Sequence, residues 1–243
     1  MSSADNPYRS WGLTAAEADT NERASFIRLT YIHLAGAVLA FMALEAFLLS
    51  LPGVGDAVSM VLGNRWGWLL VLGGFMGVSY IATAWANSST SLSTQYLGLG
   101  LYVVAEAVIF VPLLYVAQAF GEQNNVNVIP MAGLLTSIVF IGLTGIVFLT
   151  GADFSFLRTV LMLSGVVAMG VIICSAIFGF QLGLLFIGAL IALASGYILY
   201  DTSNVLHHYR IGQHVAASLA LFASVALLFW YMVQLVMSLN SRR

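Results

Sequence analysis

Apolar residues dominate the chain in long unbroken runs that short polar segments separate. The runs predict seven membrane-spanning helices, because each exceeds the ~20 residues that a helix needs to cross a hydrocarbon core ~30 Å thick. They lack the strict apolar alternation over ~10 residues that marks the strands of a membrane barrel. We therefore expect an all-α polytopic membrane protein, a seven-transmembrane-helix bundle with spans near 26–51, 66–86, 96–120, 128–150, 156–179, 182–204 and 215–239.

The fifth and sixth spans have no charge between them. Residues 159–200 contain no charged side chain, and as a single helix they would extend for roughly 63 Å at 1.5 Å per residue. One membrane cannot contain such a helix, so the chain must turn back. The turn is expected at residues 179–183, where two glycines flank Phe-Gln-Leu. Glycine pairs at helix-contact spacing, Gly63/Gly67 and Gly73/Gly77, predict close helix packing.

The composition supports the same class and excludes several functions. Only 7% of the 243 residues are charged, against roughly 25% in soluble domains, and the net charge is −2. The chain has no basic run, so no nucleic-acid partner is expected. All basic residues are arginine, which excludes a retinal Schiff base on lysine. A protease is not expected either, because the spans hold a single aspartate and residues 194–196 (Ala-Ser-Gly) lack the first glycine of a nucleophile elbow.

The arginines predict the orientation. Arg9, Arg23, Arg28, Arg158 and Arg210 lie on the N-terminal side of the spans, and Arg65, Arg242 and Arg243 lie on the other side. The positive-inside rule therefore predicts a cytoplasmic N-terminus and, with seven spans, a C-terminus outside. We expect a polar cytoplasmic tail over 1–25, a transmembrane domain over 26–239 and a short tail over 240–243. The first tail has no basic n-region or cleavage site of a signal peptide.

Three acidic residues lie inside the predicted spans: Glu45 in the first, Glu106 in the third and Asp201 near the end of the sixth. An acid near the bilayer centre costs on the order of 2.5–3.5 kcal/mol, and no arginine lies mid-span to neutralise these three. The alternating helix directions place the acids at successive depths, which predicts a polar path for ions across the bundle. The alternatives are that Glu45 hydrogen-bonds to a neighbouring helix and that Asp201 is interfacial.

Asp201 shares one helix face with three other polar residues. Tyr197 lies four residues before it, and Asn204 and His208 lie three and seven residues after it, so the four form one stripe. A carboxylate, an amide and an imidazole at the cytoplasmic mouth of the path predict pH sensing near neutrality.

No metal or cofactor is expected. The spacing of His207, His208 and His214 matches no standard metal motif. The single cysteine, Cys174, lies deep in an apolar segment and has no partner for an intrachain disulfide.

Four segments, in order along the chain, resemble the Bax inhibitor-1 family, the transmembrane Bax inhibitor motif-containing proteins. They are residues 22–31 (ERASFIRLTY), the acid Glu106 in the third span, residues 153–157 (DFSFL) and residues 195–202 (SGYILYDT). The resemblance covers nearly the whole chain and is closest to a bacterial-type member. It implies a seven-helix bundle with the sixth-helix aspartate at the cytoplasmic end, in a bacterial inner or plasma membrane.

The resemblance also implies a function. Members are pH-sensitive leaks for calcium or another cation, eukaryotic members suppress cell death, and one bacterial member is similar to a modulator of a membrane-bound ATP-dependent protease. In the calcium-leak members the sixth-helix aspartate pairs with an aspartate of the seventh helix. Ser224 stands at that second position here, within residues 223–229 (ASVALLF), so the two-aspartate latch cannot form.

Two hypotheses follow, neither of which is an enzyme. The first is a conduit in which Asp201 and Glu106 line a polar path and protonation of Asp201 shifts an open–closed balance. The second is a non-conducting regulator that acts through the polar N-terminal tail on a membrane protease or another membrane assembly.

Overall fold

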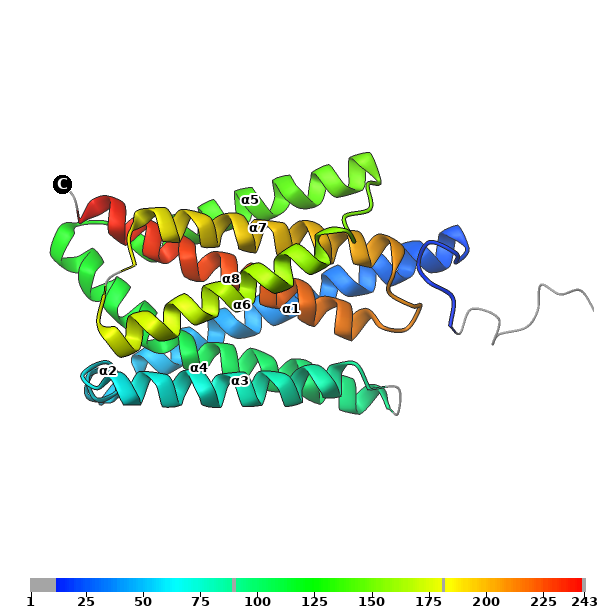
Figure 1. Ribbon diagram of the computed structural model, residues 1–243. Helices are drawn as coiled ribbons and strands as arrows, with labels where there is room; N and C mark the ends of the chain where they lie inside the picture. The colour runs from blue at the N-terminus through cyan, green and yellow to red at the C-terminus, as the bar shows by residue number, and fades with distance from the viewer. Residues whose placement is uncertain (1–11, 89–90, 181, 242–243) are drawn as a thin grey trace, which may run out of the picture.

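The computed structural model of the protein describes residues 12–88, 91–180 and 182–241, and these form eight helices. Seven are long and apolar enough to cross a membrane, which confirms the predicted helical bundle. The helices, drawn in Figure 1, are α1 (Thr20–Ser50), α2 (Val54–Leu62), α3 (Arg65–Ala86), α4 (Leu92–Asn124), α5 (Val128–Thr150), α6 (Leu157–Phe178), α7 (Leu184–His207) and α8 (His214–Asn240).

The start of α1 and the end of α8 lie at opposite ends of the bundle, as an odd number of spans requires (Figure 1). We call the end where α1 starts the N-terminal end. It also holds the α5–α6 and α7–α8 connections and so gathers Arg28, Arg158 and Arg210. Arg9, Arg242 and Arg243 of the orientation argument lie outside the described residues, as does Gln181 of the predicted turn.

Two features differ from the predicted spans. The first helix begins at Thr20 rather than near residue 26. Its first polar turns extend beyond the apolar run, where water can satisfy the free backbone N–H groups of the helix start. The segment between the first two predicted spans forms the nine-residue helix α2. Gly53 lies just before it in the left-handed conformation (φ 85°), which turns the chain between α1 and α2.

Helices α4 and α8 form the centre of the bundle. Both are mostly buried, and α8 packs against α1, α4, α5 and α7. Phe41 of α1 packs edge-to-face on Phe110 of α4 and Phe222 of α8, with ring centroids 5.0 and 6.0 Å apart. In contrast, α6 presents large apolar side chains such as Leu163 and Val166 outward, as a lipid-facing helix does.

Helices α3 and α4 approach each other closely at Gly98. A Cβ atom added at Gly98 of α4 would lie 2.5 Å from the backbone nitrogen of Ala86 and 2.6 Å from the carbonyl oxygen of Ala82. Only glycine fits this contact. The glycine-pair prediction was wrong for Gly73 and Gly77, which face open space.

The N-terminal segment packs against the α7–α8 connection. The backbone N–H of Ala15 donates to the Tyr209 carbonyl (2.8 Å), and the Ile211 N–H donates to the Leu13 carbonyl (3.0 Å). Ala15 is fully buried in this contact. The part of the predicted polar tail that precedes residue 12 lies outside the described residues.

Candidate functional site

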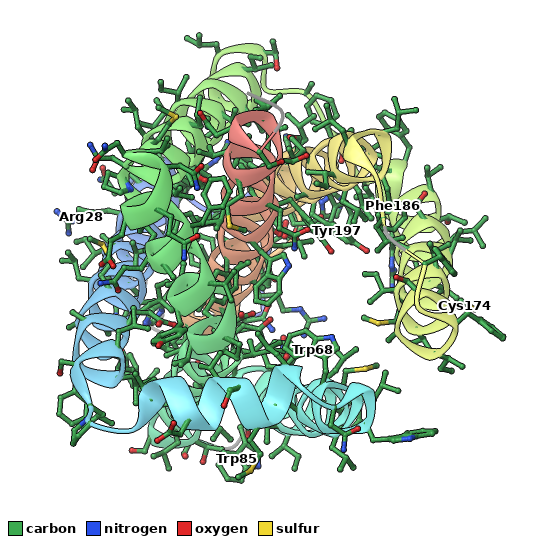
Figure 2. The ribbon with its side chains drawn as sticks, turned by 90° about the vertical axis from the view of Figure 1, so that its left-hand side faces the viewer. Arg28, Trp68, Trp85, Cys174, Phe186 and Tyr197 are labelled. Carbon is green, nitrogen blue, oxygen red and sulfur yellow. The ribbon has the colours of Figure 1, made fainter. Side chains whose placement is uncertain are left out.

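A cavity of about 570 Å³ lies among five helices, α3, α4, α6, α7 and α8. Figure 2, which looks along the bundle, shows Trp68 and Tyr197 pointing into the space between α3 and α7, while Arg28 lies on the outside. Along α8 the lining runs from Ala216 to Tyr231, roughly 22 Å at 1.5 Å per residue. This length is a large part of a ~30 Å hydrocarbon core.

Two of the predicted acids line this cavity, and they come from different helices. Asp201 projects from α7 and Glu106 from α4, and both side chains are more than nine-tenths buried. Asp201 lies six residues before the end of α7, roughly 9 Å from that end, whereas Glu106 lies roughly 21 Å into α4 from the same end of the bundle. The cavity therefore presents carboxyl groups at two depths.

Ser224 is the direct partner of Asp201. Its hydroxyl donates to Oδ2 of the carboxylate at 2.5 Å and joins α7 to α8 at a buried point. The position where the two-aspartate latch was expected to fail thus holds one carboxylate and one hydroxyl in direct contact. Within the described part of the chain, Oδ1 of Asp201 accepts no hydrogen bond.

Tyrosines surround the two acids. Tyr102, one helical turn before Glu106 on α4, lies close to the Glu106 carboxyl group and within electrostatic reach of Asp201. Tyr209, in the α7–α8 connection, is close to Asp201, and burial together with the nearby Asp201 raises the pKa of its phenol. Tyr197 lines the cavity too, and its hydroxyl donates to the Leu161 carbonyl of α6 at 2.9 Å. Sequence reasoning singled out Tyr197 of these three but not Tyr102 or Tyr209.

Glu45 does not line the cavity. It lies near the end of α1 that is remote from Asp201, and it is buried. Neither of its carboxyl oxygens has a hydrogen-bond partner among the described residues. The structure thus brings together two of the three acids expected to form the path.

The four residues of the predicted stripe do not all face the cavity: Tyr197 and Asp201 line it, whereas Asn204 and His208 do not. Asn204 is half-buried and does not line the cavity, and its carbonyl accepts the N–H groups of His208 and Tyr209. His208 follows the last residue of α7, and its Nε2 lies 3.6 Å from Oδ2 of Asp153. His208 therefore faces the α5–α6 connection and not Asp201.

Hydrogen bonds of the segment at 153–157 hold the α5–α6 connection against α7. Oδ1 of Asp153 accepts the Ser155 N–H at 2.8 Å and the Ser203 hydroxyl at 3.3 Å. Ser203 Oγ in turn accepts the Phe154 N–H at 2.9 Å. The backbone N–H of Ser155, with His208 nearby, holds the pKa of Asp153 below its usual value. These hydrogen bonds attach the α5–α6 connection to α7 at Ser203, two residues after Asp201.

A second polar cluster joins three helices near the N-terminal end of the bundle. Nδ1 of His33 on α1 donates to the Leu29 carbonyl at 2.7 Å, which leaves Nε2 to accept the Tyr96 hydroxyl of α4 at 2.9 Å. His214 of α8 lies 3.5 Å from the same hydroxyl. Sequence reasoning missed this cluster, because its members are 63 and 118 residues apart. Among the described residues, no three His, Cys, Asp or Glu side chains gather as metal ligands.

Comparison with known proteins decides the family. Residues 23–242 match the family model described as inhibitor of apoptosis-promoting Bax1. The chain belongs to the Bax inhibitor-1 family. The motif segments at 153–157 and 195–202 and Glu106 all lie within the matched region of this family.

Proteins of bacteria and of a plant are similar to the chain in sequence. An uncharacterized protein of Pseudomonas aeruginosa is 29% identical over 92% of this chain and 93% of its own length. An uncharacterized protein of Pasteurella multocida is 30% identical over 82% of this chain and 83% of its own. Protein LIFEGUARD 4 of Arabidopsis thaliana is 32% identical over 56% of this chain and 54% of its own. No solved structure matches the chain.

Proposed function

We propose that this Bax inhibitor-1 family protein is a pH-sensitive leak pathway for calcium or another cation, with Asp201 and Glu106 in the path. One observation carries the proposal: two buried carboxyl groups from different helices line one cavity that follows α8 for roughly 22 Å. Intramembrane acids that face a cavity mark ion or proton pathways. In this proposal the N-terminal end of the bundle faces the cytoplasm.

Ser224 affects how Asp201 gains and loses its proton in the proposed pathway, because the two side chains are hydrogen-bonded. A carboxylate that shares a hydrogen bond with a hydroxyl is still a single titrating group, whereas two facing carboxylates would share a proton. Protonation of Asp201 removes the negative charge that attracts a cation and so lowers the flux. Conduction requires an ion to bind weakly enough to leave, and a single carboxylate with a hydroxyl provides few of the six to eight oxygen ligands of a tight calcium site.

The test is calcium flux into proteoliposomes at one pH below and one pH above neutrality. The wild-type protein should conduct more at the higher pH, and Asp201→Asn should lose the pH response. Ser224→Asp, which introduces a second carboxyl group, should shift the pH of half-maximal flux upward. Glu45→Gln is the matched control, because it neutralises a buried acid outside the cavity. Wild-type flux no greater than in protein-free liposomes, or an unchanged pH response in Asp201→Asn, would refute the proposal.

The docked N-terminal segment favours a second candidate, a regulator of a membrane-bound ATP-dependent protease or another membrane assembly. The contact of Ala15 with Tyr209 connects this segment to the connection that follows α7. A partner that engaged the tail would therefore act eight residues from Asp201. Deletion of residues 2–22 should abolish co-purification of such a partner while Asp201→Asn leaves it intact. A partner that still co-purifies after the deletion would count against this candidate.

A further inference from the structure

The walls of the cavity are aromatic. Nine of its lining residues carry aromatic rings, on all of the surrounding elements except α6. Trp68 of α3 and Trp230 of α8 stack with centroids 6.1 Å apart and planes 22° apart, and Phe110 packs edge-to-face on Trp230 at 4.9 Å. The faces of such rings attract positive charge, by about 0.5–1 kcal/mol at exposed sites and about 2 kcal/mol or more where the cation is desolvated.

The charged groups of the cavity are all of one sign. Among its described lining residues, Asp201 and Glu106 are the only ones with carboxyl groups, and none is an arginine or histidine. Ser224 satisfies one oxygen of Asp201 and leaves the other without a hydrogen bond among the described residues. A ligand that brings its own positive charge would therefore supply the counter-charge that none of the described lining residues supplies.

The size and polarity of the cavity decide between ligand classes. Pockets for drug-sized molecules measure roughly 300–1,000 Å³ and combine apolar walls with a few placed polar groups, which describes this cavity of about 570 Å³. A small hydrated metal ion gains little from tryptophan and phenylalanine walls. An organic cation uses both features, because its apolar body contacts the rings while its charge faces the carboxyl groups.

We propose that the cavity binds a lipophilic organic cation, such as a quaternary or aromatic ammonium or phosphonium compound, between Trp68 and Trp230 on one side and Asp201 and Glu106 on the other. The inference rests on the proposed function only in that it uses the same cavity and the same two carboxyl groups. It requires equilibrium binding and no conduction.

The test is equilibrium dialysis of radiolabelled tetraphenylphosphonium against the full-length protein in nanodiscs of zwitterionic lipid. Tetraphenylborate is the matched probe, because it has the same shape and the opposite charge. The wild-type protein should bind the phosphonium saturably, and tetraphenylborate should neither bind saturably nor compete. The Glu106→Gln/Asp201→Asn double variant should bind the phosphonium at least tenfold more weakly.

Two further variants keep the result interpretable. Glu45→Gln removes a buried acid that lies outside the cavity and should bind like the wild type. Trp68→Leu should weaken binding while both carboxyl groups remain, and each variant is compared only when it elutes from a sizing column as the wild type does. Equal binding of the borate, unchanged affinity in the double variant, or no saturable binding by the folded wild type would overturn the inference.

The outcomes also separate this inference from the proposed function. Saturable phosphonium binding without calcium flux would refute the leak and leave the ligand site standing. Calcium flux whose pH response is lost in Asp201→Asn, together with no phosphonium binding, would support the leak and refute the ligand site.

Discussion

The contact between α3 and α4 at Gly98 makes a quantitative prediction about stability. Gly98→Ala places a methyl group 2.5 Å from the Ala86 nitrogen, and ordinary contacts of a Cβ atom begin near 3.4 Å. Both nearby atoms belong to the backbone, so relief requires the two helices to separate by almost an ångström. Overpacking of this kind costs about 1–3 kcal/mol.

Gly100→Ala is the control on the same helix. A Cβ atom at Gly100 meets nothing within 4 Å, so this substitution brings only the helix-propensity gain of about 1 kcal/mol. Gly98→Ala receives the same gain, and the difference between the two variants isolates the steric term. We therefore expect Gly98→Ala to be about 1–3 kcal/mol less stable than Gly100→Ala, which for a chain of this size corresponds to a melting temperature lower by about 2–12 °C.

The assay is thermal unfolding of both purified variants in the same detergent, followed by circular dichroism. Equal melting temperatures would refute the close approach of α3 and α4. A second readout concerns the site, because Thr83 and Asn87 lie beside the contacting residues Ala82 and Ala86 and line the cavity. If the helices separate, Gly98→Ala should also weaken phosphonium binding, whereas Gly100→Ala should not.

Three other substitutions test individual polar groups by the same unfolding assay. Ser224→Ala leaves Oδ2 of the buried Asp201 unpaired and should lower the free energy of unfolding by about 1–3 kcal/mol. Ser218→Ala is the control and should lower it clearly less, because Ser218 loses only a hydrogen bond to its own helix. Equal losses in the two variants would contradict the Asp201 contact. Glu45→Leu should raise stability by about 1–3 kcal/mol, because its buried oxygens have no partner among the described residues, and a loss would contradict that. The pKa of Asp153 is lowered in the folded protein, so the stability that its carboxylate contributes is present above the unfolded pKa of about 3.9 and is lost as the pH falls further. Because the side chain is half exposed, Asp153→Asn should lower the free energy of unfolding near neutral pH by less than about 1 kcal/mol. The variant should also lose less stability than the wild type on acidification, and an equal loss would refute this prediction.

The helices were predictable because the bilayer imposes a length on them. The absence of charge from residues 159–200 required a reversal, and α6 and α7 are indeed separate helices with Gly179 in the left-handed conformation between them. The start of α1 at Thr20 was not predictable from hydropathy, because hydropathy marks where lipid ends and not where a helix ends. The short helix α2 was missed for a related reason, since its nine residues are far fewer than a span needs.

The acids of the site were predictable, and its aromatic walls were not. A carboxyl group within an apolar run stands out whatever surrounds it, so Asp201 and Glu106 could be named from the sequence alone. Tryptophan and tyrosine are common in membrane helices, and nothing in the sequence distinguishes Trp68, which faces the cavity, from Trp66, which is largely exposed. The difference depends on the rotation of each helix about its axis, which packing against neighbouring helices determines.

Glu45 shows how this limit affects the function. Position along a helix gives the depth of a residue, and by depth alone Glu45 continued the path begun by Asp201 and Glu106. A path also requires the residues to face the same space, and Glu45 lies on α1, which does not line the cavity. Two carboxyl groups of the described residues therefore line the cavity, Asp201 roughly 9 Å and Glu106 roughly 21 Å along their helices from the N-terminal end of the bundle. Beyond Glu106 the described lining residues include no further acid, and in the proposed pathway a cation would meet aromatic side chains there, among them Phe110, Trp230 and Tyr231.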